Sequence, residues 1–85
     1  MKKLQKLENY LNKNGIEFNK KSLYDNTCVE YMFISKGVKF YIRRLKDSIE
    51  LDYQPNKEIE SFKDTVFFYP HTQNELVDII EKVLR

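Results

Sequence analysis

The chain has 85 residues, of which 41% are hydrophobic, 33% are charged and 14% are aromatic. This length allows one domain, residues 1–85, and the composition is that of a globular rather than a disordered chain. One cysteine and one histidine exclude an internal disulfide framework and a multi-cysteine zinc site. The formal net charge of +2 conceals an asymmetry. Residues 1–46 carry eleven basic and four acidic side chains, whereas residues 47–85 carry four and nine.

Amphipathic helices are predicted at both ends of the chain. Residues 2–14 repeat apolar side chains at a spacing of three to four, and Gly15 stands where a left-handed residue is expected to end the helix. Thr72 and Glu75 match a capping box, with Thr72 as the N-cap and Glu75 reaching back. The second helix is therefore expected to run from this cap to about Leu84.

Alternating apolar residues predict strands between the helices. Short strands are expected from residue 16 to 19, 28 to 34, 38 to 43 and 65 to 69. Lys20 and Lys21 are expected to lead from the first strand into a turn. The second strand is apolar on both sides except for Glu30, so it could be covered on both faces. Residues 58–64 suit either a helical turn or a loop.

One predicted hairpin specifies its own register. If the hairpin tip lies at Lys46-Asp47, apolar residues are opposite each other on one side of the hairpin, in the pairs Phe40–Tyr53 and Ile42–Leu51. On the other side acidic residues are opposite Tyr41 and Arg43, in the pairs Tyr41–Asp52 and Arg43–Glu50. Pairs such as Arg43–Glu50 would neutralise part of the charge asymmetry locally.

The predicted fold class is α+β, in the order α-β-β-β-β-(β)-α. It is a two-layer sandwich in which a four- to five-stranded antiparallel sheet carries the N- and C-terminal helices on one face. The other face is then free for solvent or a partner, unless the last strand lies centrally and is buried on both faces.

The residues that usually perform catalysis are sparse. A cysteine–histidine dyad would need Cys28, inside a predicted strand, to meet His71, which precedes the last helix, together with a third orienting group. With Gly15 and Gly37 as the only glycines, no glycine-rich phosphate-binding loop is possible. The acidic residues from 52 to 64 lack the spacing of a calcium loop. We therefore expect no enzyme activity, no catalytic residue, no metal site and no cofactor.

The first functional hypothesis is a non-enzymatic protein-binding domain. The uncovered face of the predicted sheet combines apolar, aromatic and charged side chains of the kinds found at protein interfaces: Met32, Ile34, Tyr41, Arg43, Glu50 and Asp52. The small size and the many residues with AT-rich codons suit an inhibitor or adaptor encoded by a phage or mobile element. Such a protein, of which anti-CRISPR proteins are an example, would act on a host protein or nucleoprotein complex. Self-association into a homodimer, through an edge strand or the uncovered face, is a further possibility.

The alternative hypothesis is a nucleic-acid-binding module. Its contacts would be the basic side chains of the first half of the chain: Lys20, Lys21, Lys36, Lys39, Arg43 and Arg44. Residues 36–43 resemble the start of the central RNA-recognition-motif signature, with Val38 in place of its first aromatic residue. The order of elements resembles that of double-stranded-RNA-binding domains and HicA-type mRNA interferases. Asn26-Thr27-Cys28 stands where those toxins have glycine-serine-histidine, so the resemblance implies binding without the catalytic histidine.

The sequence also bears on location. No stretch approaches the roughly 20 apolar residues of a membrane-spanning helix. The lysines at the start of the chain are not followed by the apolar run of a signal peptide. We expect a soluble, cytoplasmic protein without a membrane partner.

Overall fold

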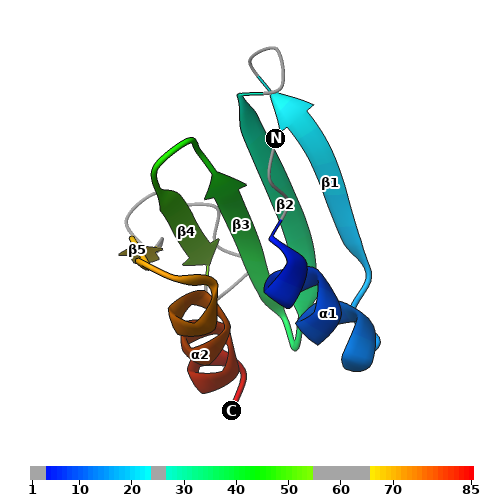
Figure 1. The fold of residues 1–85 in the computed structure, drawn as a ribbon. Coiled ribbons are helices and arrows are strands. Elements are labelled where there is room, and N and C mark those ends of the chain that lie inside the picture. Colours follow the sequence, from blue (N-terminus) through cyan, green and yellow to red (C-terminus); the bar gives the residue numbers. More distant parts are fainter. Residues whose placement is uncertain (1–3, 24–26, 55–65) are drawn as a thin grey trace.

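The computed structural model describes residues 4–23, 27–54 and 66–85. The elements follow the predicted order: α1 (Gln5–Lys13), β1 (Phe18–Leu23), β2 (Cys28–Ser35), β3 (Val38–Arg44), β4 (Ile49–Gln54), β5 (Val66–Phe68) and α2 (Gln73–Leu84). The strands form one antiparallel sheet in the order β1-β2-β3-β4-β5, as Figure 1 shows. The predicted α+β fold with a helix at each end is thus confirmed, while the prediction for residues 58–64 lies outside the described residues.

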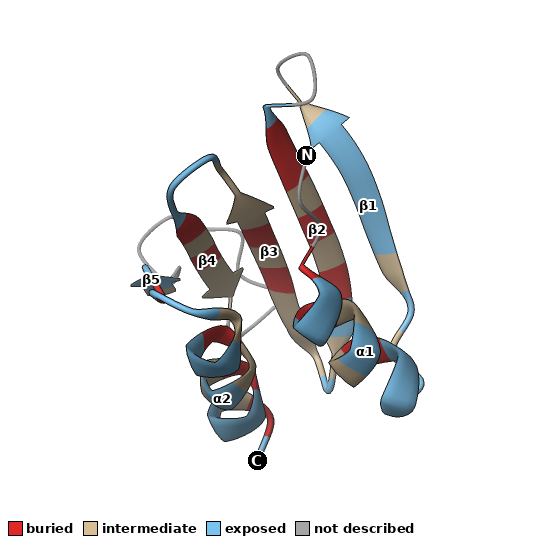
Figure 2. Cartoon of the chain, viewed as in Figure 1, coloured by how far each residue is buried: buried red, intermediate tan, exposed pale blue. Residues whose placement is uncertain are grey.

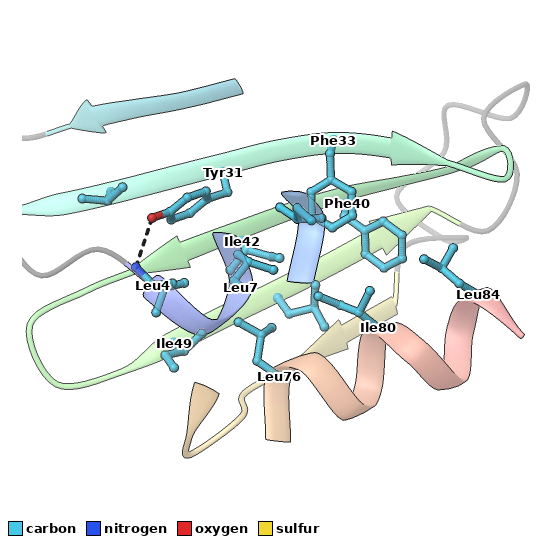
Figure 3. Packing of buried hydrophobic residues seen from close by; sticks show 13 residues of the cluster. Leu4, Leu7, Tyr31, Phe33, Phe40, Ile42, Ile49, Leu76, Ile80 and Leu84 are labelled. Carbon is cyan, nitrogen blue, oxygen red and sulfur yellow. Dashed lines mark hydrogen bonds between the residues drawn. The ribbon is translucent and has the colours of Figure 1, made fainter. Parts of the chain in front are cut away.

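Both helices pack on one face of this sheet, where they enclose a single core (Figure 3). The core contains buried residues from the N-terminal helical segment, the sheet and α2: Leu4, Leu7, Leu11, Val29, Tyr31, Phe33, Phe40, Ile42, Ile49, Leu51, Leu76, Ile80 and Leu84. Phe33 and Phe40 are directly opposite in β2 and β3, and their rings stack with centroids 4.8 Å apart. Burial of each such side chain contributes about 1.5–3 kcal/mol, so this face supplies most of the stability of the domain.

Polar contacts join the two helices at their N-terminal ends. The backbone N–H of Lys6 donates to Gln73 Oε1 at 2.9 Å, and Lys6 Nζ donates to Asn74 Oδ1 at 3.0 Å. Because these residues are 67 and 68 positions apart in sequence, the contacts hold the first and last helices of the chain together. Neither helix in the described ranges is long and apolar enough to cross a bilayer.

The helix ends are formed as the sequence predicts. Gly15 has φ +66°, its N–H donates to Asn12 O, and the Ile16 N–H donates to Leu11 O, which together form a Schellman motif after α1. At the start of α2, Thr72 Oγ1 accepts from the Glu75 N–H at 3.1 Å. The Glu75 carboxylate reaches back to the N–H of His71, one residue before the N-cap.

The structure corrects one expectation about the strands and decides two alternatives that the sequence leaves open. Lys20 and Lys21 lie within β1 rather than leading into a turn, because the ladder with β2 continues through them to Leu23. Both helices occupy one face of β2, whereas its other face changes along the strand from the fully buried Cys28 to Ile34, which is 51% exposed. The last strand is not central: β5 lies at an edge of the sheet and pairs with β4 alone among the described strands.

Candidate functional site

The open face is the side of the sheet that points away from α1 and α2. Directly opposite residues of antiparallel strands project to the same side, so the register assigns its side chains in four rows. These rows are Ile34, Lys39 and Gln54; Asn19, Met32, Tyr41, Asp52 and Phe67; Lys21, Glu30, Arg43 and Glu50; and Leu23 and Cys28, of which Cys28 is fully buried. The structure therefore brings all six residues of the predicted protein-binding set onto one face: Met32, Ile34, Tyr41, Arg43, Glu50 and Asp52.

An ionic ladder crosses the open face from β1 to β4 and consists of Lys21, Glu30, Arg43 and Asp52. Lys21 Nζ lies 3.5 Å from Glu30 Oε1, and Arg43 Nε lies 3.0 Å from Glu30 Oε2. Arg43 Nη1 continues the ladder to Asp52 Oδ2 at 3.2 Å. The side chains of Glu30 and Asp52 are each 13% exposed, so the two carboxylates are well shielded from water.

Arg43 makes different ion pairs from the one that the hairpin register suggests. It lies directly opposite Glu50, as predicted, but its ion pairs are with Glu30 on β2 and with Asp52, diagonal to it on β4. A long guanidinium side chain can reach such a diagonal neighbour. The position of β2 beside β3 supplies Glu30, which the β3–β4 hairpin alone does not contain.

The environment of Arg43 keeps the ladder charged. Burial by itself lowers the pKa of the Arg43 guanidinium, but the hydrogen bond to Asp52 and the charges of Asp52 and Glu30 outweigh it. The resulting pKa of Arg43 lies above its ordinary value. The guanidinium is therefore a permanent cation between two carboxylates.

Exposed apolar side chains lie near the ladder, one towards the end of β2 and one beyond Asp52 on β5. Ile34 on β2 and Phe67 on β5 are 51% and 53% exposed, whereas Met32 and Tyr41 between them are half-buried. Lys39 Nζ lies over the Tyr41 ring, 5.3 Å from its centroid. The open face thus combines paired charges at its centre with exposed apolar groups towards its ends.

The register also decides which aromatic residues of the last strand belong to this face. Alternation along the strand by itself allows two sets on this face, Phe67 with Tyr69 or Val66 with Phe68. Phe67 pairs with Asp52 on the open face, whereas Phe68 pairs with Leu51 on the helix side and stacks on Tyr53 at 6.1 Å. Only the pairing of β5 with β4 supplies this assignment.

A hollow of about 1050 Å³ borders the Ile34 end of the open face. It lies between the C-terminal end of α1, the start of β1 and the end of β2, and is lined by residues 12, 14–19 and 32–36. Most of its lining is polar, and Met32 and Ile34 supply apolar surface from the open face. The hollow is a wide recess that opens to solvent.

The basic residues of the alternative hypothesis do not form one surface. Lys21, Lys39 and Arg43 are on the open face, whereas Lys20 and Arg44 are opposite Tyr31 and Val29 on the helix side. Lys36 forms the β2–β3 turn together with Gly37, and its Nζ donates to the carbonyl of Leu84 at 2.9 Å. Several of these cations already have acidic or carbonyl partners within the chain.

A second polar group, the Tyr31 cluster, lies on the helix side and consists of Leu4, Glu8, Lys20 and Tyr31. Tyr31 Oη donates to Glu8 Oε2 at 2.6 Å. It accepts from the Leu4 N–H at 3.0 Å, the hydrogen bond drawn in Figure 3. Lys20 Nζ lies 3.1 Å from Glu8 Oε2. Burial, and then the hydrogen bond to Glu8, raises the pKa of Tyr31 above its ordinary value. These contacts attach the start of α1 to β1 and β2.

The Tyr31 cluster was not predicted from the sequence. Its one available signal is a tyrosine at a core position of a strand, because a buried hydroxyl generally needs a hydrogen-bond partner. The partner, Glu8, is 23 residues away. The cluster has the geometry of a structural attachment rather than of a site that meets a ligand.

The structure places the cysteine and the histidine of the chain in different environments. Cys28 is fully buried, and burial raises the pKa of its thiol despite the opposing effect of Arg43, so the thiol is a poor nucleophile. His71 is exposed, and its backbone N–H helps to cap α2. Within the described part of the chain, no three His, Cys, Asp or Glu side chains are grouped to hold a metal ion.

The five-stranded meander has two strands more than the helix–three-strand–helix order of the double-stranded-RNA-binding domains and HicA-type toxins that the sequence resembles. Comparisons with known proteins do not identify a different family for this chain. No protein-family model, no curated protein and no solved structure matches this chain.

Proposed function

We propose that this chain is a protein-binding domain whose contact surface is the open face. The observation that carries the proposal is the exposure of Ile34 and Phe67, each more than half accessible, on a face whose central charges are already paired. Apolar side chains exposed together on one face of a small domain are characteristic of an interaction surface.

The ionic ladder suits coverage by another protein. A partner that buries an unpaired charge must supply a counter-charge or lose binding free energy to desolvation. Glu30, Arg43 and Asp52 have their partners within the domain, so a protein can cover them with few charges of its own. Ile34, Met32 and Phe67 would then supply apolar contacts around them.

The charge of the open face favours a protein over a nucleic acid. Three basic side chains, Lys21, Lys39 and Arg43, are balanced by three acidic ones, Glu30, Glu50 and Asp52. Nucleic-acid binding depends on excess basic charge that displaces counterions from phosphates. A face with no net charge lacks that source of affinity.

The more specific role of the protein remains a prediction from size and codon usage. On that prediction it is a phage-borne inhibitor or adaptor of anti-CRISPR type that binds a host protein or nucleoprotein complex in the cytoplasm. The open face is the surface through which such an inhibitor would act.

The test is capture of partners by matched variants. The immobilised chain, Ile34→Glu and Asn9→Glu are incubated with nuclease-treated lysate of a low-GC bacterium. Asn9→Glu adds the same charge at an exposed position of α1, where a carboxylate oxygen can still accept the hydrogen bond from Gln5. We expect proteins that bind the wild-type chain and Asn9→Glu but not Ile34→Glu. Binding of a purified captured protein should slow amide exchange in β2–β4.

Two results would contradict the proposal. One is capture of the same proteins by Ile34→Glu as by the wild-type chain, and the other is capture of none. A shift of labelled RNA or duplex DNA that weakens steeply with salt would instead favour the nucleic-acid alternative. We expect no such shift, even at low salt.

A further inference from the structure

The two edges of the sheet differ sharply in chemistry. The edge strand β1 exposes polar residues from Asn19 to Ser22, two of which are lysines. The edge strand β5 contains only Val66, Phe67 and Phe68, and Tyr69 follows it. Phe67, Phe68 and Tyr69 are 53%, 36% and 66% exposed. Figure 2 shows both edges in the colour of exposed residues, although their side chains are of opposite character.

This difference matters because a strand at the edge of a sheet offers backbone N–H and C=O groups to another strand. Proteins prevent such pairing with charged side chains on the edge, most often lysine. β1 has this protection in Lys20 and Lys21, whereas β5 has no charged residue. The edge without charged side chains is also the one with exposed aromatic rings.

We propose that β5 pairs antiparallel with β5 of a second copy of this chain. A twofold axis normal to the sheet at Phe67 places this residue opposite its own copy and Val66 opposite Phe68 of the copy. Directly opposite residues have Cβ atoms about 4.5–5.5 Å apart, a distance at which aromatic pairs stabilise a sheet.

The absence of charge on β5 makes a second copy of the strand a compatible occupant of this edge. Symmetric pairing of β5 brings no like charges together, because the strand and Tyr69 are uncharged. Symmetric pairing of β1 would instead bring Lys20 and Lys21 near their own copies, which is unfavourable. The self-pairing edge is therefore β5 and not β1.

The proposed dimer has two structural consequences. The axis normal to the sheet joins the open faces of the two copies into one surface and keeps all four helices on the other side. Because β5 is three residues long, the pairing includes few backbone hydrogen bonds, so the dimer fraction should depend on protein concentration. The inference does not rest on the proposed function, because it concerns the strand edge and a second copy.

Sedimentation equilibrium over about a hundredfold range of protein concentration tests this inference. We expect the average mass of the wild-type chain to rise from monomer towards dimer. Phe67→Lys should remain monomeric, because it places two cations opposite each other at the axis. Asn19→Lys adds the same charge in the same row of the open face at the β1 edge, and it should dimerise like the wild-type chain. Circular dichroism shows whether each variant is folded.

A cross-linking experiment checks the register without added charge. Phe67→Cys should form an intermolecular disulfide under mild oxidation, whereas Asn19→Cys should not; the native Cys28 is buried in both. A wild-type chain that stays monomeric throughout the range would overturn the proposal. Dimerisation of a folded Phe67→Lys, or equal cross-linking of the two cysteine variants, would overturn it as well.

Discussion

Neighbouring residues Phe40 and Tyr41 show how differently the two faces of this sheet are built. Phe40 projects into the core, is fully buried and stacks on Phe33. Tyr41, one position later, projects to the open face, remains half-exposed and lies beneath the Lys39 ammonium group. The helix side derives its stability from apolar packing, whereas the open face has paired charges and exposed apolar groups that packing does not need. This difference indicates where the domain is free to bind.

The largest expected effect is that of Phe40→Ala, which should lower the free energy of unfolding by about 3–5 kcal/mol because it leaves a cavity in the core. Tyr41→Ala on the open face should cost about 1 kcal/mol or less. Urea unfolding followed by circular dichroism measures both. If Phe40→Ala leaves no folded protein, Phe40→Leu replaces it. Equal losses at the two positions would mean that both faces contribute equally to stability.

A smaller loss is expected for Tyr31→Phe, which removes one hydroxyl from the helix side. The Leu4 N–H then loses its acceptor and Glu8 loses a donor, which should cost about 1–3 kcal/mol. Tyr41→Phe makes the same chemical change on the open face and should alter stability by no more than about 0.5 kcal/mol. The same unfolding assay applies. A neutral Tyr31→Phe would show that the cluster does not hold α1 on the sheet.

The Tyr31 cluster should also make stability depend on alkaline pH. Burial, and then the hydrogen bond to Glu8, raises the pKa of Tyr31 above that of an unfolded tyrosine, about 10. The folded state therefore keeps this stabilisation below about pH 10 and loses it as pH rises towards the folded pKa.

Urea midpoints measured from about pH 8 to about pH 11 should fall less steeply in Tyr31→Phe than in the wild-type chain. Part of the decline should remain, because burial and then the charge of Glu81 raise the pKa of Tyr10 as well. Identical slopes in the two proteins would exclude a contribution from Tyr31.

The smallest effect is expected in the ionic ladder of the open face. A double-mutant cycle with Arg43→Gln and Asp52→Asn should give a coupling energy of about 0.5–1 kcal/mol, because the pair is partly accessible to water. This coupling should decrease as salt is added. The matched cycle with Arg43→Gln and Glu50→Gln should give a weaker coupling, since the ion pairs of Arg43 are with Glu30 and Asp52. A stronger coupling to Glu50 would contradict the described ladder.

The sequence by itself determined the features that depend on neighbouring residues. The order of elements, Gly15 after α1 and the Thr72 cap of α2 follow from local backbone preferences and hydrogen bonds. The register of the β3–β4 hairpin follows from two-residue periodicity, because a slip of one residue would expose Ile42 and bury Arg43. Tyr41, Arg43, Glu50 and Asp52 share one side of the hairpin for the same reason, whereas Met32 and Ile34 join that side through the pairing of β2 with β3.

The tertiary structure alone decided what depends on residues far apart in the sequence. β1 extends through Lys20 and Lys21 because β2 supplies their ladder partners, and Arg43 pairs with Glu30 because β2 lies beside β3. The place of β5 at an edge depends on its pairing with β4. Periodicity states which side chains share a face of a strand, but not which strand lies beside it or which face the helices cover. Those choices come from burying one continuous core.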